Sequence, residues 1–496
     1  MFTLSDMNLL TKILFGKLPP AKVTESYDDL SPEGLTMGTL IVGRQGTGKT
    51  SSLARQIVDH FINYPNEAVF VLDWSGSITD AILTLILQLP AEAHEKAVKR
   101  LIYDELGNRE WVVPFPEFTD EFGTYEEQVQ RVSTNLAKLA PALVLNAPLL
   151  GGLGIREIAP QIFRLICAIS NENNESWQIT EAKRLIIDEN LMRRALKIYG
   201  YKVPEAKYFL ENIYLAIKNS ERELRTYALL SLLGTIEPRE TRARIGYYRA
   251  GWTPKEVIDK GMMVIVNGAN MINQRNAQHY LFTQPYSVIM GEINKRTPGN
   301  PDDQPVSLVL DEVYSLIGIP GMAEEIGMIS PLYRSRKLQL YVVIQSLSQL
   351  AKPLDEQIWS LGNKVVFAME NKEEAERIAH QLFKYDPRYM KQPAKSQTQN
   401  NITEPEAGQD RIIADWIQNL KFRECLMRRF YSERKLDSQV RHVLKTREFP
   451  TRPLSTTLYE FKDNLLRERA VRVRDALEVI NQRKLATTVN NSVPQL

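Results

Sequence analysis

The sequence contains little cysteine and little histidine. Its 496 residues include two cysteines, Cys167 and Cys425, which lie far apart, and five histidines. Two such cysteines provide neither a disulfide framework nor a cysteine zinc site, and the histidines do not fall at metal-ligand spacings. This cysteine usage is typical of a protein from a reducing compartment, so a cytoplasmic location is predicted.

The sequence also lacks an excess of charge of one sign and lacks long apolar runs. Lys and Arg number 62 and Asp and Glu 60, which gives a formal net charge of +2. This balance excludes a uniformly basic protein that coats nucleic acid and an acidic disordered chain, but it allows a local basic surface. No stretch approaches the roughly 20 apolar residues of a membrane span, and the first residues lack the cationic leader of a secretory signal. We therefore expect no direct membrane span.

Length and apolar periodicity predict several domains. At roughly 150 residues per domain, two to four are expected. Strand-like runs alternate with helical patterns on either side of a stretch in which apolar residues recur three and four apart, as in FRLICAI and KYFLENIYLAI. Such alternation is typical of an α/β domain with a parallel sheet, here interrupted by an all-α insertion. The predicted division is a helical arm and linker over 1–35, the first part of the α/β domain over 36–124, the all-α domain over 125–250, the second part of the α/β domain over 251–395, and a C-terminal linker, appendage and charged helix over 396–496.

The C-terminal hundred residues leave two questions open. Residues 410–450 either return to the sheet or form a small appendage. Within them, residues 421–447 mix Lys and Arg with Phe422, Phe430 and Tyr431, which suits a DNA-contacting surface, but interspersed acidic residues favour a plain solvated face. Residues 458–484 are expected to form one charged helix.

The strongest chemical signal is GRQGTGKT at residues 43–50, which fits G-x-x-x-x-G-K-[ST]. In this pattern the glycines let successive N–H groups face phosphates, Lys49 brings positive charge to the β- and γ-phosphates, and the Thr50 hydroxyl can ligate Mg²⁺. A strand-like run precedes the loop and a helical pattern follows, and a helix N-terminus favours an anion. The predicted nucleotide-binding residues are Gly43, Gln45, Gly46, Thr47, Gly48, Lys49 and Thr50.

The second signal is the apolar run VSLVLDEV, which ends in Asp311 and Glu312. A buried strand that ends in an acidic residue beside a phosphate loop places a carboxylate near Mg²⁺, and an adjacent Glu can deprotonate the attacking water. We therefore predict Asp311 and Thr50 as metal ligands and Glu312 as a catalytic residue. Asp73, at the end of another strand, is either a competing metal ligand or a helix cap.

The third signal is YRSRKLQLYVVIQSLSQL at residues 333–350, a predicted strand that ends at Gln345. A Gln at this place can sense the γ-phosphate or the water, or it is a satisfied amide at a strand end. Arg334 and Arg336 precede the strand. Either they belong to a solvated loop, or one of them reaches the nucleotide of a neighbouring subunit and stabilises transition-state charge.

In these segments the chain resembles the HerA–FtsK superfamily of P-loop ATPases. GRQGTGKT, VFVLDWSGSITD, VSLVLDE and RSRKLQLYVVIQSLSQL carry the resemblance, and the ending IQSLSQL and the helical insertion are similar to TraG-type coupling proteins of type IV secretion and conjugation. The resemblance implies a RecA-like core that assembles as a ring, usually a hexamer, and hydrolyses ATP with Mg²⁺ to move DNA. It assigns phosphate and Mg²⁺ binding to Lys49 and Thr50, metal to Asp311, water activation to Glu312, sensing to Gln345, and action in trans to Arg334 or Arg336.

Three functions follow from these observations. The first is an ATP-driven DNA translocase or coupling ATPase of a conjugative or mobile-element transfer system, with a relaxase or secretion-system proteins as partners that hold it at a membrane complex. The second is a HerA-like motor that works with a nuclease in end processing or defence. The third is a docking protein that recognises protein cargo through the helical insertion and uses ATP as a switch.

Overall fold

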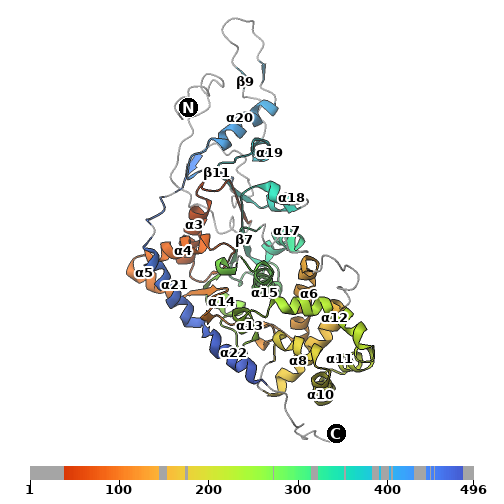
Figure 1. Cartoon of the computed structure of the whole chain (residues 1–496). Coiled ribbons are helices and arrows are strands. Elements are labelled where there is room, and N and C mark those ends of the chain that lie inside the picture. The colour runs from red at the N-terminus through yellow and green to blue at the C-terminus, as the bar shows by residue number, and fades with distance from the viewer. Residues whose placement is uncertain are drawn as a thin grey trace.

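The computed structural model describes residues 38–143, 154–173, 177–271, 273–313, 322–350, 354–382, 390–391, 402–403, 406–428, 443–446, 448–451 and 453–483. The predicted N-terminal arm over 1–35 lies outside these residues, as do Phe430 and Tyr431. Figure 1 shows an elongated molecule with the sheet in the middle, helices α19 (Lys372–Leu382) and α20 (Glu406–Gln418) at one end, and a lobe of helices at the other.

The core is a nine-stranded sheet in the order β12-β11-β8-β1-β7-β6-β2-β5-β3, parallel from β8 to β3. Strands β1, β2, β6 and β7 are buried along their whole length, which is typical of parallel strands with both faces covered. The predicted α/β class with a mostly parallel sheet is confirmed. The strands are β1 (Thr39–Val42), β2 (Ala68–Asp73), β3 (Leu101–Glu105), β5 (Met263–Asn267), β6 (Val306–Asp311), β7 (Leu338–Ile344), β8 (Asn363–Val366), β11 (Glu424–Arg428) and β12 (Val443–Lys445).

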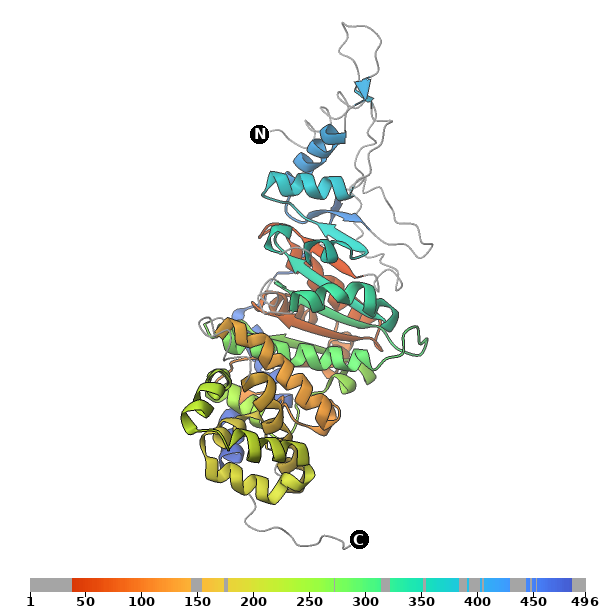
Figure 2. The ribbon, with the colours of Figure 1, turned by 90° about the vertical axis from the view of Figure 1, so that its right-hand side faces the viewer.

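Helices cover the two faces of this sheet (Figures 1 and 2). One face carries α3 (Lys49–Asn63), α4 (Ser77–Leu87) and α5 (Ala91–Lys99), and the other carries α14 (Pro254–Asp259), α15 (Arg275–Asn294), α17 (Met322–Tyr333) and α18 (Leu354–Trp359). The apolar side chains between the layers form one continuous core. Among the described residues, no helix is both long enough and apolar enough to cross a membrane.

The sheet extends past residue 395, where the second part of the α/β domain was expected to end. Strand β11 pairs antiparallel with β8, and β12 pairs antiparallel with β11. Of the two alternatives for residues 410–450, the return to the sheet is therefore the one observed. Cys425 lies in β11 and, like Cys167, is buried and forms no disulfide bond.

The lobe in Figure 2 is built from the helices between residues 125 and 246. Its interior contains the fully buried side chains of Phe163, Trp177 and Tyr199. It is fastened to the α/β part by the Arg244–Asp104 ion pair of 2.6 Å, whose two side chains are buried. The α-helices of the lobe are α6 (Tyr125–Leu143), α8 (Ala159–Asn173), α9 (Ala182–Ile187), α10 (Glu189–Tyr199), α11 (Pro204–Phe209), α12 (Asn219–Thr235) and α13 (Arg239–Gly246).

The C-terminal segment forms two helices, so the prediction of one charged helix over 458–484 was wrong. Helix α21 (Ser455–Arg469) and helix α22 (Val473–Gln482) are separated by β13 (Val471–Arg472), which pairs with β4 (Trp111–Val112). That pairing draws the chain out of the helical conformation. Helix α21 lies against β3 and α4, and α22 packs on α13 in the lobe, so the two helices bridge both parts of the molecule (Figure 1).

Candidate nucleotide-binding site

The glycine loop joins the buried strand β1 to helix α3, as predicted. A Cβ atom on Gly43 would lie 2.6 Å from the Cβ of Phe367, so the loop fits against the end of β8 only because residue 43 has no side chain. The Arg44 N–H donates to the Ala368 carbonyl over 2.8 Å and fixes the same contact. Gly48 has a φ of 100°, a conformation that glycine adopts without strain, and helix α3 begins directly after it.

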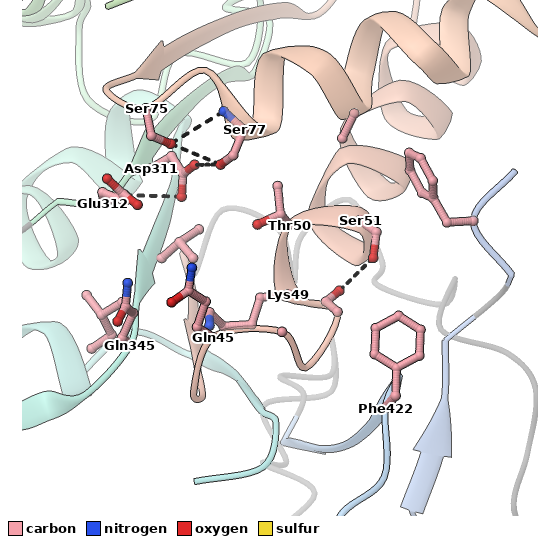
Figure 3. A pocket seen from close by; sticks show the side chains of 16 residues that line it. Gln45, Lys49, Thr50, Ser51, Ser75, Ser77, Asp311, Glu312, Gln345 and Phe422 are labelled. Carbon is pink, nitrogen blue, oxygen red and sulfur yellow. Dashed lines mark hydrogen bonds between the residues drawn. The ribbon is translucent and has the colours of Figure 1, made fainter. Parts of the chain in front are cut away.

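Lys49 is folded back over this loop. Its Nζ donates to the carbonyl of Gly43 and, over 2.8 Å, to that of Arg44. Burial lowers the pKa of Lys49 to about 8, while the negative charges of Asp311 and Glu312 act against that shift. Lys49 therefore lies in the same part of the site as the predicted metal ligand Asp311 and the predicted catalytic residue Glu312 (Figure 3).

Asp311 ends strand β6, and its neighbour across the sheet is Asp73 at the end of β2. The Ser77 hydroxyl donates to Asp311 Oδ2 over 3.1 Å, and Ser75 Oγ lies 3.1 Å from Ser77 Oγ (Figure 3). Burial, together with the charges of Asp73 and Glu312, raises the pKa of Asp311 to about 7. Three carboxyl groups thus crowd the same end of the sheet.

Asp73 caps helix α4, which decides between its two predicted roles. Its Oδ1 accepts the N–H groups of Ser75 and Gly76 over 3.1 and 2.8 Å. Its Oδ2 accepts the N–H and the hydroxyl of Thr79 over 2.8 and 2.6 Å. With both oxygens occupied and the residue fully buried, Asp73 holds the β2–α4 turn and is not placed to ligate a metal.

Glu312 follows Asp311 in a conformation that non-glycine residues rarely adopt, with a φ of 50°. Such backbone strain, of order 1–3 kcal/mol, is retained where the surrounding structure holds it and is commonest at functional sites. The conformation directs the Glu312 side chain into the same cavity that Lys49 and Thr50 line (Figure 3).

Gln345 lies at the end of β7, the strand that separates β1 from β6. Because Val42 and Leu310 pair with Ile344 and Val342, the three strands end at nearly the same level. The Gln345 side chain reaches the cavity between the glycine loop and Glu312 (Figure 3).

The structure separates Arg334 and Arg336 from the residues above. Both lie in a short 3₁₀ helix before β7, hence at the amino edge of the sheet, and a strand of this length spans about 20 Å. Arg336 donates from Nε to the Arg296 carbonyl over 3.1 Å and lies over the Tyr333 ring at 5.6 Å, whereas the Arg334 side chain is exposed. Neither arginine reaches the glycine loop of its own chain.

A cavity of about 540 Å³ joins these groups. The predicted residues that line it are Gln45, Gly46, Gly48, Lys49, Thr50, Asp311, Glu312 and Gln345, whereas the predicted Gly43 and Thr47 are not among its lining residues. The lining residues that were not predicted as part of the site are Ser51, Ser75, Ser77, Ala81, Val343, Ile344, Phe422 and Phe449. Ser75 and Ser77 follow Asp73 in the segment WSGSITD, where hydroxyl groups after an acidic strand end were an available signal.

The residues present fit a nucleotide with Mg²⁺. Lys49 lines the cavity, and its ammonium group donates to two carbonyl groups of the loop. A phosphate in the cavity can take the place of these two acceptors. Burial and the negative charges of Asp73 and Glu312 raise the pKa of Asp311, and a bound divalent cation would offset this repulsion between carboxylates. Thr50 and Asp311 could supply oxygen ligands, which is the kind that Mg²⁺ takes, and phosphates and waters commonly complete its shell.

Residues 305–421 match the family described as the TraM recognition site of TraD and TraG. This part of the chain is similar to TraD and TraG, as the resemblance to TraG-type coupling proteins implies. Solved structures show that the fold of the whole chain is similar to that of a coupling protein. The unbound conjugative coupling protein TrwBΔN70 superimposes with a TM-score of 0.55 at 13% identity, covering 89% of this chain and 98% of that one.

Two further TrwB structures show the same similarity to the coupling-protein fold. The complex with ADP and Mg²⁺ has a TM-score of 0.53 at 12% identity, covering 88% of this chain and 93% of that one. The complex with a non-hydrolysable ATP analogue has a TM-score of 0.52 at 13% identity, covering 89% and 99%. No curated protein matches the sequence. The predicted RecA-like P-loop core is thereby confirmed.

Proposed function

We propose that this protein is an ATP-hydrolysing coupling protein that moves DNA in a conjugative or mobile-element transfer system. The observation that carries the proposal is the meeting of Lys49, Thr50, Asp311, Glu312 and Gln345 around one cavity. The match over 305–421 favours this function over a HerA-like motor paired with a nuclease and over an ATP-switched docking protein. TrwB, which shares the fold, is a plasmid coupling protein solved with ADP and Mg²⁺, and this supports the same ligands here.

In the proposed reaction, the N–H groups of the loop and Lys49 hold the β- and γ-phosphates. Thr50 and Asp311 would hold Mg²⁺, which would supply positive charge to the phosphate oxygens. Glu312 orients a water and accepts its proton as the water attacks the γ-phosphorus. The bond between the γ-phosphorus and the bridging oxygen breaks, and ADP leaves. Gln345 donates from its amide to the γ-phosphate or to that water.

A ring of subunits, a hexamer in this proposal, would complete the site. Arg334, whose side chain is exposed, is better placed for a neighbouring subunit than Arg336, whose side chain is half-buried. An arginine from the next subunit would stabilise the charge that develops on the transferred phosphoryl group. Because the matched family is described as a TraM recognition site, we further propose a protein of that kind, a relaxase or a secretion-system protein as the partner at a membrane complex.

The direct test is ATP hydrolysis by the full chain with and without single- and double-stranded DNA, together with sedimentation in the presence of a non-hydrolysable ATP analogue. The expected result is stimulation by at least one form of DNA and assembly into a ring. Lys49→Ala is the control that removes hydrolysis. Hydrolysis that is unaffected by DNA, from a protein that stays monomeric, would contradict the proposal.

A further inference from the structure

The nucleotide cavity has two chemically different ends. At one end lie Asp311 and Glu312, and at the other lies the aromatic ring of Phe422, with Ser51 of helix α3 facing it (Figure 3). Phe449 lines the same cavity. A nucleoside triphosphate has the same polarity, because its γ-phosphate and its base lie at opposite ends. With the γ-phosphate at the carboxylates, the base extends toward the aromatic end.

Phe422 belongs to a turn that is fastened to the glycine loop. The Glu424 N–H donates to the Lys421 carbonyl over 2.9 Å and closes the turn. Arg423, its third residue, has a φ of 70°, a conformation for which turns of type II normally use glycine. Its N–H donates to the Thr47 carbonyl over 3.0 Å, which joins the turn to the glycine loop. The strained backbone at Arg423 thus fixes Phe422 beside the loop.

The segment that carries Phe449 is fixed from a different side. The Thr446 N–H donates to the Arg423 carbonyl over 2.9 Å, and Arg55 of helix α3 donates to the Glu448 carbonyl over 2.8 Å. Phe449 is half-buried against the core, whereas Phe422 leaves 64% of its surface exposed. A large ring held open to solvent by a closed turn is available to stack on a flat ligand.

We propose that Phe422, with Phe449 as a flanking wall, is the platform on which the nucleobase stacks. The inference rests on the proposed function, since it takes the ligand to be a nucleoside triphosphate. Stacking of a base on an aromatic ring depends on the π-face and not on hydrogen bonds, so the platform accepts adenine and guanine alike. The composition of residues 421–447 favoured a DNA-contacting surface or a solvated face for Phe422. Its position in the cavity assigns it to the nucleotide instead.

The test compares two ligands on the full-length protein with Mg²⁺, namely ATP and inorganic tripolyphosphate, which has the phosphates but no base. Phe422→Ala and Phe422→Leu should weaken ATP binding about tenfold and change tripolyphosphate binding less than twofold, because only the stacked base is lost. Phe422→Trp should bind ATP as tightly as the unaltered protein. Tyr459→Ala is a matched control, because Tyr459 is also exposed, at 70%, but lies on α21 outside the cavity.

Equal weakening of both ligands by Phe422→Ala would overturn the proposal, because the side chain would then act by holding the glycine loop. Unchanged ATP binding would also overturn it. If the unaltered protein binds neither ligand, the platform and the proposed function fail together. If ATP binds with the expected dependence on Phe422 but is not hydrolysed, the platform stands and the proposed hydrolysis fails.

Discussion

The two edges of the parallel sheet hold their cationic side chains in different ways. At the carboxyl edge, Lys49 is buried and fixed by two carbonyl groups of its own loop. At the amino edge, about 20 Å away, Arg334 is exposed and Arg336 is engaged with Arg296 and Tyr333. The carboxyl edge can therefore be organised within one subunit, whereas an arginine of the amino edge can act on a nucleotide only across a subunit boundary.

The largest expected effect tests that division. Arg334→Ala should lower the rate of ATP hydrolysis about 10³-fold, the lower end of what an arginine supplied in trans contributes. Arg336→Ala should cost much less, because its guanidinium is held by its own chain. The measurement is steady-state hydrolysis at saturating ATP, with nucleotide binding followed in parallel and expected to stay unchanged.

A mixing experiment separates action in trans from a structural role. Subunits with Lys49→Ala and subunits with Arg334→Ala should each be inactive alone, and a mixture should recover part of the activity. In a mixed ring, an intact glycine loop of one subunit meets an intact Arg334 of the next. If the mixtures assemble but recover no hydrolysis, Arg334 does not act on the nucleotide of a neighbouring subunit.

The next effect in size concerns Glu312. Glu312→Gln keeps the shape of the side chain but removes the proton acceptor, so hydrolysis should fall about 10²- to 10³-fold while ATP still binds. Glu292→Gln is the matched control, because Glu292 of α15 pairs with the nearby Lys295 at 2.7 Å and does not line the cavity. Retained hydrolysis in Glu312→Gln would place the proton acceptor elsewhere.

Asp73→Asn tests whether Asp73, unlike its neighbours Asp311 and Glu312 at the carboxyl edge, stabilises the fold. The substitution replaces one carboxylate oxygen by an NH₂ group, which then faces donors and leaves them unpaired. Loss of such buried hydrogen bonds should lower the free energy of unfolding by about 2–3 kcal/mol, measured by urea denaturation. The partly exposed Asp463, which pairs with Arg467 at 2.8 Å, supplies the control, since Asp463→Asn should change stability by less than about 0.5 kcal/mol.

The smallest effect is expected at Gln345. Gln345→Ala removes one hydrogen bond to the phosphate or the water and should lower kcat about tenfold with little change in KM. Gln349→Ala shows whether a loss comes from the turn instead, because Gln349 Oε1 accepts the backbone N–H groups of Gln345 and Ser346. Equal losses in both variants would mean that Gln345 acts through the conformation of the turn.

Much of the fold and part of the site followed from local sequence patterns. Continuous apolar runs predict buried parallel strands, and Asp311 and Glu312 lie where such a run ends. The catalytic and ligand-binding roles of these residues, and the domain boundaries, stay predictions.

Features that depend on distant parts of the chain were not accessible in this way. The break between α21 and α22 follows from the pairing of β13 with β4, a strand that lies more than 300 residues earlier in the sequence. The two possible roles of Asp73 could be separated only once its four donors were visible. From the sequence, Phe422 could be interpreted only through the composition of its segment, because no local pattern predicts that residue 422 lies beside the glycine loop.

The contact between Arg423 and Thr47 has a consequence for how the protein is made. Arg423 is synthesised roughly 375 residues after Thr47, which takes about 20–75 s at ordinary rates of translation. During that time the nascent chain can fold the β1–α3 unit, but the turn that holds Phe422 and the strand β11 are still absent. A growing polypeptide therefore carries an incomplete cavity until translation is well advanced, and the aromatic end of that cavity is added together with the last strands of the sheet.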